Sequence, residues 1–493
     1  MGTFGVAAPA SRVFAFRASL EREGLLVVVC GALTAFWAFS APYWLEADSW
    51  LTLLGGREIH ARGIPRTDEL AVLTHGQQWV DQQWLAQLFF WNLTRLGGIR
   101  LDLLVTVALL VAPLVLAVRF ARRRGASPIS IVPFVALSAL PLTSFLHAQL
   151  FSQLLFVVLL ALLARESREP SRRVFLAFPL LVLWANLHGA VVVGAALVAL
   201  LGACELAARR RSPRAAALLV APWLCLVATP YGLDTLGYYK ATIANPVLRQ
   251  TVTEWMSPTF TGRHGILLFL LACAGVALVV KRPRDLTRFE LAALLLTLAG
   301  AMLAVRSIAW FAYACLMLLP PLREATRKPA ATGHEPNRLH ALPAFVMAAV
   351  AVGAIAAIAL APTSKLTRHW PPEAAAAVRQ VTSEDPNARV LAANRYGDWL
   401  LYELPELRGR IAFDGRWELL KTEQARQVFD YFWQVGDWES LSDGYRVIVL
   451  DPKLQPDLVK TYDRRRDVRT LYRDGRFVVY DRGAGADSPA VFD

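Results

Sequence analysis

The sequence predicts a polytopic α-helical membrane protein of about eleven transmembrane helices, followed by a C-terminal external α/β domain. Apolar residues make up 55% of the 493 residues and charged residues only 18%, and the mean hydropathy is +0.39. Many apolar runs approach the ~17–25 residues that a spanning helix needs. Strongly basic loops separate alternate runs. This composition excludes an ordinary soluble enzyme.

The expected spans define a membrane body at residues 1–361 that contains a long first external loop at 43–100. They lie at 24–42, 101–120, 128–146, 148–164, 174–187, 189–207, 215–230, 265–280, 289–304, 307–321 and 342–361. The first loop is rich in Trp, Gln, Asp and His, which predicts amphipathic pieces on the membrane surface.

The loops predict the orientation of the chain in the membrane. Five alternate loops carry clusters of arginine, at 121–127, 165–173, 208–214, 281–288 and 323–340. The positive-inside rule places them, and the N-terminus, in the cytoplasm and the C-terminus outside. The first apolar run lacks a convincing cleavage site, so we expect it to be a retained span.

The net charge of +13 predicts no nucleic-acid partner. Residues 362–493 carry 20 Lys and Arg side chains against 21 Asp and Glu, so the excess belongs to the membrane body. Loop orientation and contact with anionic membrane lipids account for that excess. All five cysteines fall in expected spans, and residues 362–493 have none.

Residues 362–493 predict a small α/β domain after a Pro-containing boundary at 361–373. Short strands are expected at 389–393, 410–413, 447–450, 468–472 and 477–480, and helices at 396–404, 422–433 and 454–462. The chain has no phosphate-binding glycine loop. An external group-transfer site would therefore suit a donor that a lipid carries across the membrane.

Two carboxylates, Glu46 and Asp48, directly follow the first span between Trp44 and Trp50. Ionised groups at a membrane boundary are costly and often functional. A carboxylate there can take a proton from an attacking hydroxyl, which is the role we expect for Asp48. The alternative is a solubilising charge at a helix end, which fits Glu46 better.

Two further clusters are expected on the external side. Asp81, Gln82 and Trp84 can bind a polar head group or a sugar, or they can belong to an interfacial helix anchored by tryptophan. Asn186 and His188 end an apolar span, where they can line a cavity or form a bond between helices. His147 and Gln149 have the same two interpretations.

Later segments add candidate ligands. Tyr231 and Glu254 lie in the external loop 229–264, where Glu254 can be a second acid, a metal ligand or part of a Pro-capped surface loop. Arg306 begins a span and suits a phosphate, or it extends its side chain to the interface. Asp414 and Arg416 follow a predicted strand and can bind a ligand or pair with each other.

The chain resembles the GT-C superfamily of polyprenol-dependent membrane glycosyltransferases, and a large bacterial group within or near it. The resemblance rests on the segments ADSWLTLLGGREIHARGIPRTDELAVLTHGQQWVDQQWLAQLFF, LHAQLFSQLLF, WANLHG, TPYGLDTLGYY, TEWMSP, AVRSIAWFA and NRYGDWLLYELPELRGRIAFDGRWEL. It implies a multi-pass protein of the bacterial inner membrane.

The resemblance also implies a catalytic carboxylate at Asp48 and a sugar donor linked to polyprenyl phosphate. The chain departs from the pattern at His147-Ala148, where Arg-Pro is expected before the glutamine. If that arginine binds phosphate, Arg306 or His188 has to replace it. The cofactor stays unknown: a divalent metal is possible, but no ligand spacing identifies one.

The expected function is inverting transfer of a hexosyl or pentosyl group to an external glycan, lipid or protein in envelope glycan or glycolipid synthesis. The alternative is a non-catalytic protein that binds a lipid-linked glycan or serves as a scaffold in an envelope assembly. Fold similarity alone does not separate these functions.

Overall fold

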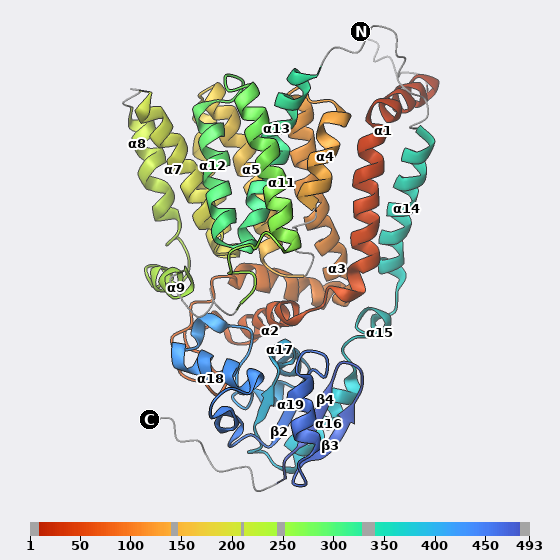
Figure 1. Cartoon of the computed structure of the whole chain (residues 1–493), viewed down its shortest axis with the longest axis vertical. Helices are drawn as coiled ribbons and strands as arrows, with labels where there is room; N and C mark the ends of the chain where they lie inside the picture. Colours follow the sequence, from red (N-terminus) through yellow and green to blue (C-terminus); the bar gives the residue numbers. More distant parts are fainter. Residues whose placement is uncertain (1–8, 140–145, 209–211, 244–251, 328–340, 484–493) are drawn as a thin grey trace, which may run out of the picture.

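The computed structural model describes residues 9–139, 146–208, 212–243, 252–327 and 341–483, with side chains from residue 22 onward. A bundle of long helices stands on one side and a mixed α/β domain on the other, as Figure 1 shows. We call the end of the bundle that carries this domain the domain side. Parts of four expected segments, at 140–145, 209–211, 244–251 and 328–340, lie outside the described residues.

Each of the eleven expected spans contains an apolar helix. The bundle helices are α1 (Pro9–Ser40), α3 (Trp84–Arg123), α4 (Pro128–Ala139), α5 (Gln149–Arg168), α6 (Ala177–Leu187), α7 (Val191–Ala207), α8 (Pro213–Cys225), α11 (Arg263–Lys281), α12 (Arg288–Leu303), α13 (Ile308–Thr326) and α14 (Ala341–Leu360). The predicted fold, a polytopic helical membrane protein with a C-terminal α/β domain, is confirmed.

The bundle helices differ in length. Among the described residues, six helices are long and apolar enough to cross a membrane by themselves: α1, α3, α5, α11, α13 and α14. The other five have 11 to 17 described residues. A 3₁₀ segment at Arg172–Leu176 lengthens α6 at its start. Neighbouring protein must therefore cover part of the depth that these shorter helices leave.

Helix α13 forms the centre of the bundle, because every residue from Ile308 to Pro320 is buried. A helix that is apolar on all sides is stable only when other helices surround it. Helices α3, α4, α5, α11 and α12 pack around it, while α14 packs against α1 at the edge of the bundle.

The first loop lies flat across the domain side of the bundle (Figure 1). It contains α2 (Ala47–Arg62) and the first part of α3, which Gly98 separates from the spanning part. Gly98 has φ 66°, a left-handed conformation that glycine adopts without a Cβ clash. The expected surface-lying pieces are thus α2 and the beginning of α3.

We expect Gly56→Ala to destabilise the protein, because α2 and α3 are in close contact at this position. A Cβ atom at Gly56 would lie 2.2 Å from the Gln87 carbonyl oxygen and 2.6 Å from Trp91 Cβ. Such overpacking costs about 1–3 kcal/mol. In Gly353→Ala, within α14, the new Cβ meets no atom within 4 Å, so this control should raise the melting temperature slightly. Melting curves in detergent test the pair, and equal shifts would contradict the close contact.

The C-terminal domain has a four-stranded sheet of order β1-β2-β4-β3. β1 (Val390–Ala392) pairs in parallel with β2 (Val447–Leu450), and β4 (Val478–Asp481) is antiparallel to both β2 and β3 (Arg469–Arg473). The helices of the domain are α15 (Thr363–Leu366), α16 (Pro372–Glu384), α17 (Asn394–Glu403), α18 (Thr422–Trp433) and α19 (Pro456–Asp463).

The strand expected at 410–413 is wrong in part, because this segment forms only single bridges. Ile411 bridges Val390 on one side and Ala71 of the first loop on the other. Val72 and Leu73 donate backbone hydrogen bonds to this segment, at 2.7 and 3.0 Å. The first loop thus continues the edge of the sheet. Helix α16 was not predicted, because its alanine-rich start follows a pair of prolines.

Helix α17 packs on α2 and joins the domain to the first loop. Arg57 donates hydrogen bonds from α2 to the carbonyl oxygens of Leu401 and Tyr402, at 2.9 and 2.7 Å. A cation there also stabilises the C-terminal end of α17. Trp370 donates from its indole to the Leu45 carbonyl at 2.9 Å and packs against Trp50. The domain is therefore seated on the loop that carries Asp48.

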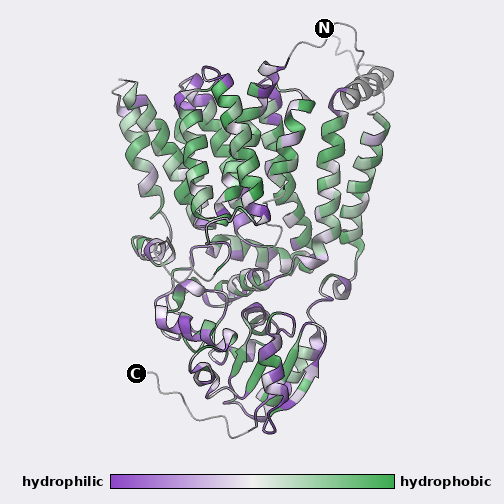
Figure 2. Cartoon of the chain, viewed as in Figure 1, coloured by the Kyte–Doolittle hydropathy of each residue, from purple (hydrophilic) through white to green (hydrophobic). Residues whose placement is uncertain are grey.

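The described parts of the basic loops lie at the end of the bundle away from the domain. Figure 2 shows hydrophilic segments there, apolar helices in the middle of the bundle, and helices and strands of mixed hydropathy on the domain side. This distribution is what a membrane-crossing body requires.

Candidate active site

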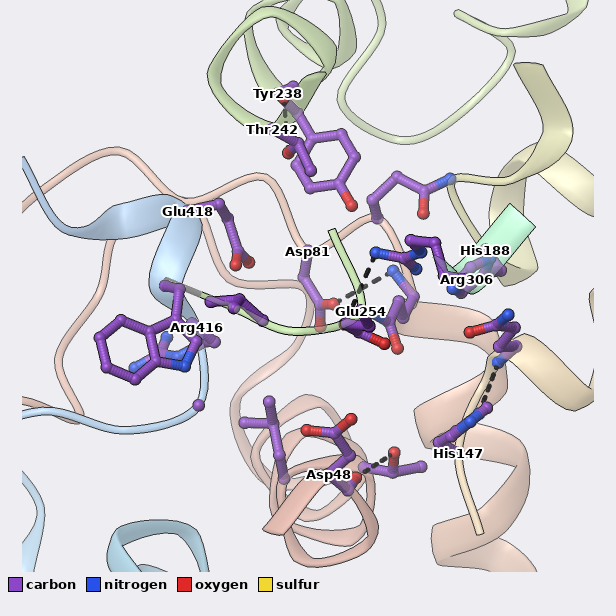
Figure 3. A pocket seen from close by; sticks show the side chains of 18 of the residues that line it. Asp48, Asp81, His147, His188, Tyr238, Thr242, Glu254, Arg306, Arg416 and Glu418 are labelled. Atoms are coloured by element: carbon purple, nitrogen blue, oxygen red, sulfur yellow. Dashed lines mark hydrogen bonds and ion pairs between the residues drawn. The ribbon is translucent and has the colours of Figure 1, made fainter. Parts of the chain in front are cut away.

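A cavity of about 470 Å³ lies between the first loop, the domain-side ends of the bundle helices and the C-terminal domain (Figure 3). Seven predicted site residues line it: Asp48, Asp81, Gln82, His188, Glu254, Arg306 and Arg416. They come from segments up to 368 residues apart in the sequence. The cavity therefore exists only in the folded protein.

Asp48 occupies the first turn of α2, where Glu46 is the N-cap residue. Its side chain faces the cavity and makes no hydrogen bond or ion pair with any described residue. Asp48 is open to the cavity, but the protein around it removes much of its hydration and so raises the pKa of Asp48 to about 6. The nearby Glu254 raises the pKa further, while Arg306 opposes the shift. The carboxyl group is thus ionised at neutral pH and more basic than usual.

Arg306 lines the same cavity and its charge acts on Asp48. The loop before α11 holds Arg306 in place. Its backbone N–H donates to the Glu254 carbonyl at 3.0 Å, and its guanidinium lies 3.7 Å from the Glu254 carboxylate. The guanidinium also stacks 4.3 Å from the centre of the Trp255 ring. These contacts orient the guanidinium group and leave other N–H donors of that group available for a ligand.

Two histidines, His147 and His188, lie beside Arg306 as neutral rings. Burial and the positive charge of Arg306 lower the pKa of His147 to about 3, and that of His188 well below its usual value. In each ring Nδ1 accepts a backbone N–H at 3.1 Å, from Gln149 and Ala190 respectively. The proton of each neutral ring is therefore on Nε2. His188 can thus donate a hydrogen bond to a ligand, while the positive charge of this region comes from Arg306.

Asp81 and Gln82 form the wall next to the first loop. Asp81 accepts hydrogen bonds from Gln87 Nε2 at 3.0 Å and from the Gln83 backbone at 3.2 Å. Burial raises the pKa of Asp81 to about 7. Gln82 donates to the Ala185 carbonyl at the end of α6, at 2.9 Å. This wall is thus held by both the loop and the bundle.

Arg416 lines the opposite wall as part of a buried network. Its guanidinium is ion-paired with Asp414 and, at 2.7 Å, with Asp68 of the first loop, and it stacks 4.2 Å from the Trp79 ring centre. The side chain is only 3% exposed. Asp414 lies behind it and does not line the cavity. Asp414 and Arg416 therefore pair with each other, which was the alternative to ligand binding.

Four other predicted site residues lie outside the cavity lining. Glu46 accepts a hydrogen bond from Arg395 of α17 at 2.6 Å. Trp84 donates to Asn186 at 3.0 Å and so joins α3 to α6. Tyr231 is buried, and the Arg66 guanidinium lies 5.0 Å from its ring centre. These contacts support the cavity from outside.

Several polar residues of the cavity were not predicted from the sequence. Among them are Gln87, Tyr238, Thr242 and Glu418. Glu418 ends the same strand-end motif that contains Asp414 and Arg416, and burial raises its pKa to about 7. Tyr238 and Thr242 lie one turn apart on α9 (Asp234–Ile243), a spacing that places both on one helix face.

Among the described residues, no group of three or more His, Cys, Asp or Glu side chains is arranged to hold a metal ion. The polar groups of the cavity fall into two sets. Carboxyl groups occur on several walls, and Arg306 with the histidines occupies the side toward the bundle. This arrangement can deprotonate a hydroxyl and stabilise a developing negative charge.

Neither family models nor curated protein sequences match this chain. Among solved structures, ArnT from Cupriavidus metallidurans bound to undecaprenyl phosphate aligns with a TM-score of 0.51 at 16% identity, covering 94% of this chain and 98% of ArnT. The apo oligosaccharyltransferase of Archaeoglobus fulgidus aligns with a TM-score of 0.51 at 11% identity, covering 89% and 70%. The GT-C fold that the resemblance implied is therefore confirmed, and at these identities the likeness establishes the fold alone.

Proposed function

We propose that this protein is a membrane glycosyltransferase that moves a sugar from a polyprenyl-phosphate-linked donor to an acceptor hydroxyl. The observation that supports this proposal most directly is that Asp48, ionised and unpaired among the described residues, shares one cavity with Arg306 at the domain side of the bundle. The GT-C fold, and the undecaprenyl phosphate bound to ArnT, support this assignment.

In the proposed reaction Asp48 accepts the proton of the acceptor hydroxyl as its oxygen attacks the anomeric carbon of the donor. The bond from that carbon to the phosphate oxygen breaks, and its electron pair leaves with the polyprenyl phosphate. Arg306 stabilises the leaving phosphate, and Nε2–H of His188 donates a hydrogen bond to it. One direct displacement inverts the anomeric configuration.

We propose that the cavity faces the outside of a bacterial inner membrane, with an envelope glycan, lipid or protein as acceptor. The other wall residues, Asp81, Gln82, Glu254 and Glu418, can bind sugar hydroxyls through their oxygen and amide groups. Envelope glycan and glycolipid profiles test the role. Cells lacking the gene should lose a component that wild-type protein restores. An unchanged profile on deletion would remove the support for envelope synthesis.

The proposed orientation predicts the outcome of reporter fusions. A fusion after Ala208 follows α7 and should report the cytoplasm, whereas one after Pro362 follows α14 and should report the outside. Both fusions should be made at matched expression. The same compartment for both would contradict the proposed arrangement of the chain.

The activity should depend on pH through Asp48. Because the loss of hydration in the cavity raises its pKa to about 6, Asp48 is mostly ionised above pH 6 and mostly protonated below it. A protonated carboxyl cannot act as a base, so kcat/KM for transfer should fall about tenfold per pH unit well below pH 6. A pH–rate profile in detergent measures this limb. A profile flat from pH 7 to pH 4.5 would contradict the assignment.

A further inference from the structure

A second cavity, of about 560 Å³, lies at the end of the bundle away from the C-terminal domain. The C-terminal ends of α3 and α5 and the first turn of α12 surround it. Its charged lining consists of Arg123, Arg124, Arg165, Arg168, Glu169 and Glu290. The proposed transfer reaction uses none of these residues.

Glu290 organises the charged side of this cavity. It is fully buried at the third position of α12 and accepts hydrogen bonds from Arg168 Nε at 3.0 Å and from the Thr287 backbone at 2.9 Å. Arg124 is ion-paired with the same carboxylate at 2.9 Å. A buried carboxylate is stable only with such partners. The two guanidinium groups are thus fixed in the wall, with one negative charge between them.

Arg123 and Arg165 add further positive charge to the lining. Both are exposed, and neither forms an ion pair or hydrogen bond with any residue that the structure describes. Four positive and two negative charges therefore leave an excess of two in the lining. Such an excess in a concave site attracts an anion.

The remaining lining is apolar, which favours an anion that also carries an apolar part. Phe120, Leu162 and two alanines continue the wall along α3 and α5. A free phosphate makes no use of an apolar wall, whereas a phospholipid has acyl chains beside its phosphate. Basic pockets between helices at a membrane surface bind lipid head groups of this kind.

We propose that this cavity binds the phosphate head group of an anionic phospholipid from the leaflet opposite the C-terminal domain. The phosphate contacts Arg123 and Arg165, while Arg124 and Arg168 form the fixed wall behind it. A general excess of basic residues in loops explains orientation. It does not explain a cavity in which a buried glutamate orders two arginines.

The test uses the purified full-length protein in neutral detergent, with native mass spectrometry to count bound lipid. Phosphatidylglycerol, phosphatidylethanolamine and inorganic phosphate are titrated separately. We expect one saturable phosphatidylglycerol site. Arg123→Gln with Arg165→Gln should weaken it about 10- to 30-fold, since each arginine near a lipid surface contributes about 1 kcal/mol. Lysine at both positions should retain most of the binding.

The matched control is Arg119→Gln with Arg172→Gln, which removes two exposed arginines near the same end of the bundle outside the cavity. This pair should leave binding within about twofold, because neither side chain contacts the proposed head group. Equal losses in both double variants would show only a general positive field and overturn the proposal. Displacement of the lipid by an equal concentration of inorganic phosphate would overturn the lipid assignment. Unchanged melting temperatures without lipid confirm that both variants fold.

Discussion

Replacing Asp48 by Asn is expected to lower sugar transfer by about 10²–10⁴-fold without affecting the fold or donor binding. Asn keeps the shape and hydrogen-bonding capacity of the side chain but cannot accept the proton. Asp48 makes no side-chain bond with a described residue, so its replacement breaks no structural contact. Transfer rates and donor binding are measured with the purified protein at matched concentration.

Three further variants sharpen this experiment. Asp234→Asn makes the same change in the first turn of α9, outside the cavity, and should leave the rate unchanged. Glu46→Gln weakens an ion pair with Arg395 and should affect domain seating more than chemistry. If Asp81→Asn abolished transfer while Asp48→Asn did not, the base would be Asp81.

Replacing Arg416 by Met is expected to destabilise the seating of the C-terminal domain by about 3–5 kcal/mol. The change leaves Asp68 and Asp414 buried without their cation, at 0% and 4% exposure. The penalty arises mainly from these two unpaired carboxylates. Melting temperature in detergent and protease cleavage between residues 363 and 483 measure it.

Arg379→Met is the matched control, because Arg379 pairs with Glu406 at 3.1 Å while both side chains are about half exposed. Exposed pairs contribute only about 0–1 kcal/mol, so this variant should melt near the wild type. Adding Asp68→Asn and Asp414→Asn to Arg416→Met should restore part of the stability. A similar loss in the Arg416 and Arg379 variants would show that the buried network is unimportant.

Hydropathy predicted the membrane body well, because each span must be apolar over a fixed length of chain. It did not predict that α8 ends at Cys225, five residues before its apolar run does, since the helix ends depend on local packing. The segment at 410–413 has the pattern of a strand, but its neighbours are β1 and the first loop. Pairing of that kind joins distant segments and leaves no local signal.

The sequence predicted how deep in the membrane the candidate site residues lie, but not where they lie around the helix bundle. Asp48, His188 and Arg306 each lie at a span end, so their depth in the membrane follows from the sequence. Their position around the bundle follows from helix packing, which residue patterns do not specify. The pairing of Glu46 with Arg395, 349 residues away, has the same origin. The neutrality of His188 arises from burial and from Arg306, and both require the fold.

The most direct test of the transferase assignment is release of polyprenyl phosphate from a labelled polyprenyl-phosphate-linked sugar in a single turnover. Wild-type protein with an envelope extract as acceptor should release the carrier and transfer the label. The Asp48→Asn protein should bind the donor equally and release about 10²–10⁴-fold more slowly. Failure of the wild-type protein to bind the donor, or release by Asp48→Asn at the wild-type rate, would contradict the assignment.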